Sequence, residues 1–125
     1  MSMDLVIEVD NEPGTLAGVT RAISDAGVNI SAATCIGPTD HAELHILVPH
    51  AGAAKHVLGL SRLAVTRERE VVVIETEDRP GELADLALKI AEAGINLDLV
   101  YVATRNRVVF GSSDLDGLKQ ALGVA

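Results

Sequence analysis

The sequence predicts an α+β protein made of two similar units, each with two helices packed on a small sheet. The first observation is an internal repeat: DNEPGTLAGVTRAISDAGVNI (10–30) returns as EDRPGELADLALKIAEAGINL (77–97), with the Pro-Gly pairs 67 residues apart (80 − 13). The second is that runs rich in β-branched residues alternate with helical patterns in both halves. Because only two copies exist, the repeat indicates a duplication rather than a solenoid.

The first half contains local signals for a strand, a turn and a helix, followed by further elements. The run DLVIEVD (4–10) predicts a strand, and Pro13-Gly14 predicts a turn that leads into a helix. Gly27 then follows an apolar stripe at helical spacing and ends the helix. That stripe consists of Leu16, Val19, Ile23 and Ala26. The remaining expected elements are a strand, a strand, a helix and a strand, at 29–36, 41–48, 51–60 and 62–67, with a turn at 37–40.

The second half repeats this order of elements. A strand at 70–76 precedes a helix whose apolar stripe is Leu83, Leu86, Ile90 and Ala93. Strands at 96–103 and 107–112 flank a tight turn at 104–106, and Asp114 caps a last helix. The order β-α-β-β-α-β is the ferredoxin-like pattern, with the helices on one face of the sheet. The second unit has no obvious fourth strand, which leaves one edge of its sheet open.

The boundary between the units is expected near residue 68, giving units at 1–68 and 69–125. Residues 62–76 lead from one to the other with almost no linker, so we expect a long, bent strand shared by both sheets. We therefore expect the units to pack tightly side by side. The open sheet edges also favour a homodimer.

Composition limits the classes of function. The formal net charge is −8, lysine and arginine form no dense cluster, and Tyr101 and Phe110 are the only aromatic residues. Such a chain repels a phosphate backbone and lacks a base-stacking platform, so direct nucleic-acid binding is not expected. The single Cys35 excludes an intramolecular disulfide and is expected to fill a small core or interface space. No signal peptide or membrane-spanning run is recognisable, so we expect a cytoplasmic protein without membrane attachment.

No group of residues predicts catalysis or metal binding. The sequence contains no nucleophile-elbow, phosphate-loop or zinc motif, so we expect neither enzymatic activity nor a cofactor. His41, Glu43 and His45 share one face of a strand, but residues two apart on a strand lie about 6.6–7 Å apart, too far for one metal ion. His50 and His56 are expected at the surface.

The segments NEPGTLAGV…DAGVNI and DRPGELADL…EAGINL each resemble the ACT domain, a small ligand-binding module of enzymes in amino-acid metabolism. Around NEPGTL and NISAATCIGPTD the first unit also resembles the regulatory small subunit of acetolactate synthase. The resemblance implies an amino-acid ligand between two units, held by the first strand–helix loop of one and the start of the second strand of the other. Carried over by position, the implied ligand-binding residues are Asn11, Pro13, Gly14, Leu16, Asp78, Pro80, Gly81 and Leu83 in the loops, and Asn29, Ile30, Asn96 and Leu97 at the strands.

Local physics agrees with these positions. Each loop ends at a helix N-terminus, where free N–H groups and the helix dipole favour a carboxylate. Asparagine both donates and accepts, whereas an ionised Asp78 only accepts and suits an α-ammonium group better. If the units pack with pseudo-two-fold symmetry, Asn11 pairs with Asn96 and Asp78 with Asn29, so the two sites differ.

Three functional hypotheses follow from the sequence. The leading one is a stand-alone tandem ACT protein that senses a small amino acid and passes this state to a partner, such as a metabolic enzyme. The second is a regulatory or assembly subunit of an amino-acid biosynthetic enzyme without its own ligand site, in which the loops are simple connectors. The third is a regulator related to transcription that acts through protein contacts.

Overall fold

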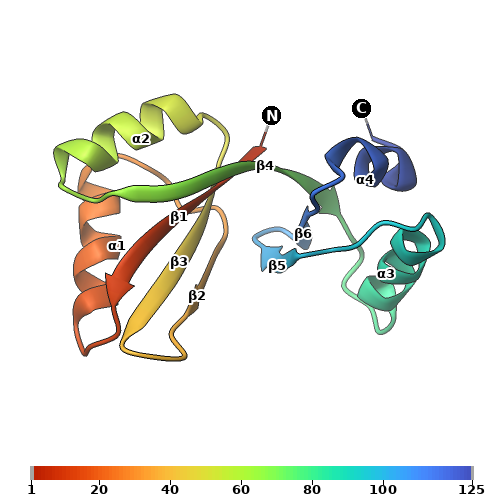
Figure 1. Ribbon diagram of the computed structural model, residues 1–125, viewed down its shortest axis with the longest axis horizontal. Coiled ribbons are helices and arrows are strands. Elements are labelled where there is room, and N and C mark those ends of the chain that lie inside the picture. Colours follow the sequence, from red (N-terminus) through yellow and green to blue (C-terminus); the bar gives the residue numbers. More distant parts are fainter. Residues whose placement is uncertain (1, 125) are drawn as a thin grey trace. The chain divides into compact units, whose positions relative to one another are not determined.

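The computed structural model describes residues 2–124 and divides into two compact units, the first ending at Arg69 and the second beginning at Glu70 (Figure 1). The first unit contains β1 (Ser2–Asp10), α1 (Thr15–Asp25), β2 (Ala33–Ile36), β3 (His41–Val48), α2 (Ala51–Leu60) and the first part of β4 (Val65–Glu75). The second unit contains the rest of β4, α3 (Glu82–Glu92), β5 (Leu99–Ala103), β6 (Arg107–Gly111) and α4 (Leu115–Leu122). The predicted α+β class is confirmed.

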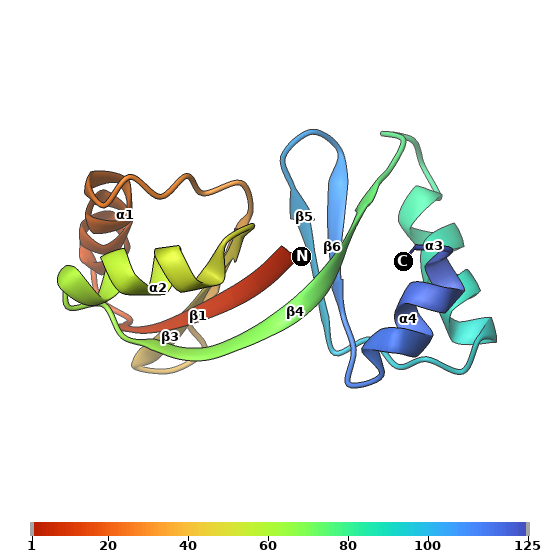
Figure 2. The ribbon, with the colours of Figure 1, turned by 90° about the horizontal axis from the view of Figure 1, so that it is seen from above.

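The first unit packs two helices on one face of a sheet with the strand order β2-β3-β1-β4 (Figure 2). Strands β1 and β3 are antiparallel, with Met3 opposite Val48 at one end and Asp10 opposite His41 at the other. Because side chains alternate along a strand, one residue in two faces the helices. The resulting core contains Leu5, Ile7, Leu44, Ile46 and Val48 from the sheet and Val19, Ile23, Ala54 and Leu58 from the helices.

The second unit is smaller and has the strand order β4-β6-β5, with α3 and α4 on one face of its strands (Figure 2). Its core is formed by Val72, Ile90, Val108, Phe110 and Leu118. The predicted cap of the last helix is confirmed, because the Asp114 carboxylate accepts a hydrogen bond from the Gly117 amide at 3.0 Å. Within residues 2–124, no strand follows α4.

The long strand that was expected to be shared by both sheets is confirmed as β4, which joins the two runs predicted at 62–67 and 70–76. Its first part lies next to β1, where the Thr66 hydroxyl donates to the Val6 carbonyl at 3.3 Å, and its second part pairs with β6. The polar run in its middle does not interrupt the strand, and three of its charged side chains form ion pairs within their own unit. These ion pairs are Arg67–Glu43, Glu68–Lys55 and Glu70–Lys119, at 2.8, 2.8 and 2.9 Å.

Two other strands are shorter than predicted, since pairing begins at Ala33 rather than 29 and at Leu99 rather than 96. In each case the chain leaves a helix through a left-handed glycine and must cross to the sheet edge before it can pair. Of the two places predicted for Cys35, the core is wrong, because this side chain lies exposed on β2, a strand at the edge of the sheet; a place in an interface stays a prediction.

Candidate functional site

The two Pro-Gly loops form the same turn in both units. Thr15 N–H donates to the Glu12 carbonyl at 3.2 Å, and Glu82 N–H donates to the Arg79 carbonyl at 3.3 Å. The glycines at the third position, Gly14 and Gly81, have φ angles of 86° and 88°. A proline at the second position and a left-handed glycine at the third define a type II turn. Both glycines are therefore required for their backbone angle, a reason that the sequence analysis did not give.

Replacing Gly14 by alanine is expected to lower the free energy of unfolding by about 1–2 kcal/mol, because an L-residue is strained at this positive φ. Nothing lies within 4 Å of a Cβ added there, so a steric clash does not contribute. Gly18, inside α1 and equally open, is the matched control: Gly18→Ala should raise the free energy by about 0.5–1 kcal/mol. Urea unfolding followed by circular dichroism measures both, and equal effects of the two variants would contradict the turn assignment.

The helices that follow these turns begin without a side-chain cap. The first helical hydrogen bonds run from Gly18 N–H to the Gly14 carbonyl (3.0 Å) and from Asp85 N–H to the Gly81 carbonyl (2.9 Å). The amides at 16–17 and 83–84 precede those donors and therefore have no helical acceptor. Each of the two N-termini can accept a negatively charged group.

The two N-termini differ in charge. The first turn of α1 has no acidic residue, whereas that of α3 carries Glu82 and Asp85. Arg79 binds both carboxylates, at 3.0 and 2.9 Å, and its hydrogen bond to Asp85 raises the pKa of its guanidinium further above its usual value. The second loop is thus occupied by its own ion pairs, and the first is open to an external carboxylate.

The side chains of Leu16 and Leu83 lie at equivalent places and are 46% and 45% exposed. They were predicted to begin the apolar stripes of the two helices, but they do not join the cores, whose helical members start at Val19 and Leu86. Each leucine therefore leaves an apolar side chain exposed in the first turn of an uncapped helix.

Asn11 has a structural role that the sequence did not predict. Its side-chain amide donates to the Gly37 carbonyl at 3.0 Å and to the Thr39 carbonyl at 2.7 Å, and its backbone N–H donates to the Asp40 carbonyl at 2.8 Å. These hydrogen bonds connect the first Pro-Gly loop to the turn between β2 and β3. The carboxamide oxygen is the group of this side chain that remains to accept a bond from a ligand.

Asn29 and Ile30 lie at the other end of the first unit, beyond the C-terminus of α1. The strand register places the Pro-Gly loop next to the Asp10–His41 end of the sheet, while α1 carries the chain about 16 Å away over its 11 residues. Asn96 and Leu97 follow α3 in the same way. No single unit therefore brings the two halves of the predicted site together.

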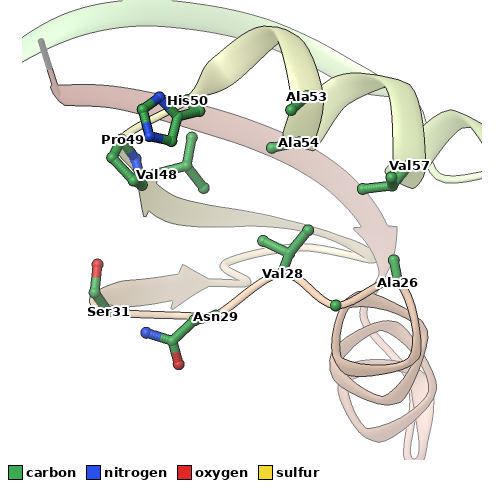
Figure 3. Close-up of a pocket in the computed structure, with 11 residues that line it drawn as sticks. Ala26, Val28, Asn29, Ser31, Val48, Pro49, His50, Ala53, Ala54 and Val57 are labelled. Atoms are coloured by element: carbon green, nitrogen blue, oxygen red, sulfur yellow. The ribbon is translucent and has the colours of Figure 1, made fainter.

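A pocket of about 370 Å³ opens at this end of the first unit (Figure 3). It lies between the C-terminus of α1, the segment that leads to β2, the end of β3 and the start of α2. Val28 points towards α2, whereas the Asn29 side chain points away from it (Figure 3). The lining residues are Ala26, Gly27, Val28, Asn29, Ser31, Val48, Pro49, His50, Ala53, Ala54 and Val57. Among them, Asn29 was predicted as a ligand-binding residue and His50 as a surface residue, but no local pattern indicated the cavity.

The sheet face opposite the helices of the first unit carries a buried ion pair. His45 Nδ1 lies 2.9 Å from Asp4 Oδ2, and the side chains are 12% and 1% exposed. The hydrogen bond that His45 donates to Asp4 raises the pKa of His45, against the opposing effect of burial, and the nearby Glu43 acts in the same direction as Asp4. Glu43 in turn binds Arg67, so that β1, β3 and β4 share one network.

Among residues 2–124, no three histidine, cysteine, aspartate or glutamate side chains come close enough to hold a metal ion. His41, Glu43 and His45 are engaged mainly with neighbouring charged groups, and His50 and His56 are exposed as predicted. None of the helices in the described chain has the length and apolar character needed to cross a membrane.

Comparison with known proteins gives matches by sequence and by structure. The family model of the ACT domain matches residues 3–58, and no curated protein matches the sequence. Protein BT0572 from Bacteroides thetaiotaomicron has a similar structure, with a TM-score of 0.84 and 27% identity over 97% of this chain and 85% of that chain.

Two further similar structures are regulatory subunits of aspartate kinase. The one from Thermus thermophilus has a TM-score of 0.68 and 15% identity, covering 98% of this chain and 89% of that chain. The one from Thermus flavus has a TM-score of 0.62 and 16% identity, covering 98% and 90%. The sequence match thus assigns an ACT domain to residues 3–58, and the described chain shares its fold with these regulatory subunits.

Proposed function

We propose that this protein is a cytoplasmic, non-enzymatic regulator in which two ACT units bind a small amino acid and signal its presence to a partner protein. The observation that carries the proposal is the duplicated type II turn. Its glycines, Gly14 and Gly81, stand at the N-cap positions of α1 and α3, so neither helix has a side-chain cap. In this proposal residues 1–68 and 69–125 are both ferredoxin-like ACT units, and within residues 2–124 no strand follows the last helix of the second unit. The ACT match at 3–58 supports the assignment of the first unit directly.

The ligand site is composed of two units. Within each unit the Pro-Gly loop and the start of the second strand are at opposite ends of a helix, so each site needs its second half from elsewhere. In this proposal the units pack side by side, within one chain or in a homodimer, and each provides the second half of the other's site. One site then joins Asn11, Pro13, Gly14 and Leu16 to Asn96 and Leu97. The other joins Asp78, Pro80, Gly81 and Leu83 to Asn29 and Ile30.

The first loop is the better carboxylate site of the two. Its helix end is uncapped and free of acidic residues, so the ligand carboxylate binds the amides at the start of α1. The exposed Leu16 contacts an apolar ligand side chain, and the carboxamide oxygen of Asn11 accepts from the α-ammonium group. Asp78 and the carboxylates held by Arg79 make the second loop less suited to an anion.

A thermal-shift screen of the intact protein against the common amino acids tests ligand binding. An amino acid present at about a hundred times its dissociation constant should stabilise the folded protein by about 2.7 kcal/mol. No shift with any amino acid would favour the alternative function, a regulatory or assembly subunit without a ligand site. That alternative draws its support from the fold shared with aspartate kinase regulatory subunits, which also makes an enzyme of amino-acid metabolism the partner to test.

Replacing Thr15 by glutamate introduces at α1 the residue that the second unit carries at the equivalent position, Glu82. We expect the affinity for the amino acid to fall at least about tenfold, because a carboxylate in the first turn competes for the same dipole and amides. The uncharged Thr15→Gln variant should stay within about threefold of the unmodified protein. Isothermal titration calorimetry measures both, and full affinity in Thr15→Glu would rule out carboxylate binding at α1.

A further inference from the structure

The pocket of the first unit has the size and the lining of a small-molecule site. Its volume of about 370 Å³ lies within the range of typical ligand cavities, roughly 300–1,000 Å³. Val28, Val48, Ala54 and Val57 give it apolar walls from three separate segments of chain (Figure 3). Val48 and Ala54 are 2% and 6% exposed and belong to the core, so this part of the wall is held rigidly.

The polar groups of the pocket favour a negative charge. His50 precedes α2 without forming a side-chain cap, and the first turn of α2 has no acidic residue. The first helical bond runs from Ala54 N–H to the His50 carbonyl at 3.1 Å, which leaves the amides at 51–53 without helical acceptors. One of these three residues, Ala53, itself lines the pocket.

The pocket offers little to a positive charge. None of the side chains that line it is acidic. Three carbonyls at the nearby end of α1 already accept one hydrogen bond each: Ala22, Ile23 and Ser24 accept from the amides of 26, 28 and 27 at 3.0, 3.2 and 2.9 Å. An anion with an apolar tail fits this lining better than a zwitterion does.

We propose that this pocket is a separate ligand site, which takes a short branched aliphatic carboxylate without an ammonium group. The carboxylate lies at the start of α2 next to His50, and the methyl groups contact the valine and alanine walls. The site is distinct from the Pro-Gly loop, which lies at the opposite end of α1, and it is contained within the first unit.

Isothermal titration of the intact protein with isovalerate, and with its neutral analogue isovaleramide, tests this proposal. We expect a dissociation constant on the order of a millimolar for isovalerate, as suits a ligand of so few atoms, and binding at least about tenfold weaker for the amide. Equal affinity for the acid and the amide, or no saturable binding of isovalerate at about 50 mM, would overturn the proposal.

Two matched pairs of variants locate the site. Ala53→Leu fills the pocket from an exposed position and should weaken isovalerate binding at least about tenfold, whereas His56→Leu, on α2 but outside the pocket, should not change it. His50→Asp places a carboxylate at the helix cap and should weaken binding at least about tenfold. His50→Asn can also cap the helix but adds no charge, so it should weaken binding less than His50→Asp does.

The outcome is independent of the amino-acid site. Thr15→Glu should leave isovalerate binding unchanged, because it acts at the other end of α1. Undiminished binding in both Ala53→Leu and His50→Asp would place isovalerate elsewhere and refute the pocket assignment.

Discussion

Replacing Phe110 by alanine is expected to lower the free energy of unfolding of the second unit by about 3–5 kcal/mol. Phe110 is fully buried and is the only phenylalanine of the chain, in a core that otherwise consists of aliphatic side chains. Its removal leaves a cavity that Val72, Ile90 and Leu118 cannot fill without moving. Because domains of this size are marginally stable, such a loss is comparable with the whole stability of the unit.

Urea unfolding measures this effect, with fluorescence of Tyr101 as the probe. Tyr101 is the only tyrosine, the chain has no tryptophan, and this side chain lies on β5 of the second unit, so its signal reports local unfolding there. Val102→Ala is the control on the same strand: Val102 is 66% exposed, and its truncation should change the stability by about 0.5 kcal/mol at most. A loss below about 1 kcal/mol for Phe110→Ala would contradict the packing of this core.

The second large effect is expected from His45→Ala, which removes the imidazole from the buried Asp4 carboxylate. Asp4 is buried completely and His45 nearly so, with 2.9 Å between the paired atoms. Removing one partner of a buried pair takes a stabilising interaction from a desolvated charge, so we expect a loss of about 3 kcal/mol. His41→Ala, on the same face of β3 but 70% exposed and 3.8 Å from its nearest carboxylate, should change stability by less than about 0.5 kcal/mol.

The effect of His45 should depend on pH in a defined direction. The hydrogen bond with Asp4 raises the pKa of His45 in the folded protein above its usual value of 6.5. The stability that this histidine contributes is therefore complete below the unfolded pKa and is lost as the pH rises through the folded pKa. The difference in melting temperature between the unmodified protein and His45→Ala should be larger at about pH 5.5 than at about pH 8.5.

A double variant and the pH dependence of the melting temperature test whether Asp4 and His45 interact. The double variant Asp4→Ala/His45→Ala removes both charges, and a thermodynamic cycle with the two single variants isolates their interaction. A coupling energy near zero, or a difference in melting temperature that grows with pH, would show that the ion pair does not act as described.

Much of the fold could be predicted from local signals. The strand at His41–Val48 and the helix at Ala51–Leu60 have the predicted bounds, and Asp114 caps its helix, because alternation, helical spacing and capping each depend on neighbouring residues. The first residues of β2 and β5 were predicted less accurately. No residue near Asn29 or Asn96 indicates where hydrogen bonding to the neighbouring strand begins. Likewise, Leu16 and Leu83 continue a helical stripe in the sequence but lie beyond the area that the sheet covers.

The candidate site was also predicted only in part. The sequence identified the two Pro-Gly loops, because Pro and Gly determine backbone angles and the repeat marks equivalent positions. It did not reveal that the Asn11 amide holds the turn at Gly37 and Thr39, since these partners are 26 and 28 residues away. The Arg79 ion pairs at the second loop, which make the two helix ends unequal, also became visible only in the structure.

The sequence by itself determined the duplicated order of elements, the positions of the two Pro-Gly turns and the aliphatic character of the cores, because each follows from the conformational preferences and the polarity of residues that are close along the chain. The tertiary structure alone decided that Asp4 and His45 form a buried pair and that the end of α1, the segment before β2, the end of β3 and the start of α2 enclose a pocket beside Val28. These features arise where distant segments meet, and the free energy of such contacts depends on distances and burial that no local pattern encodes.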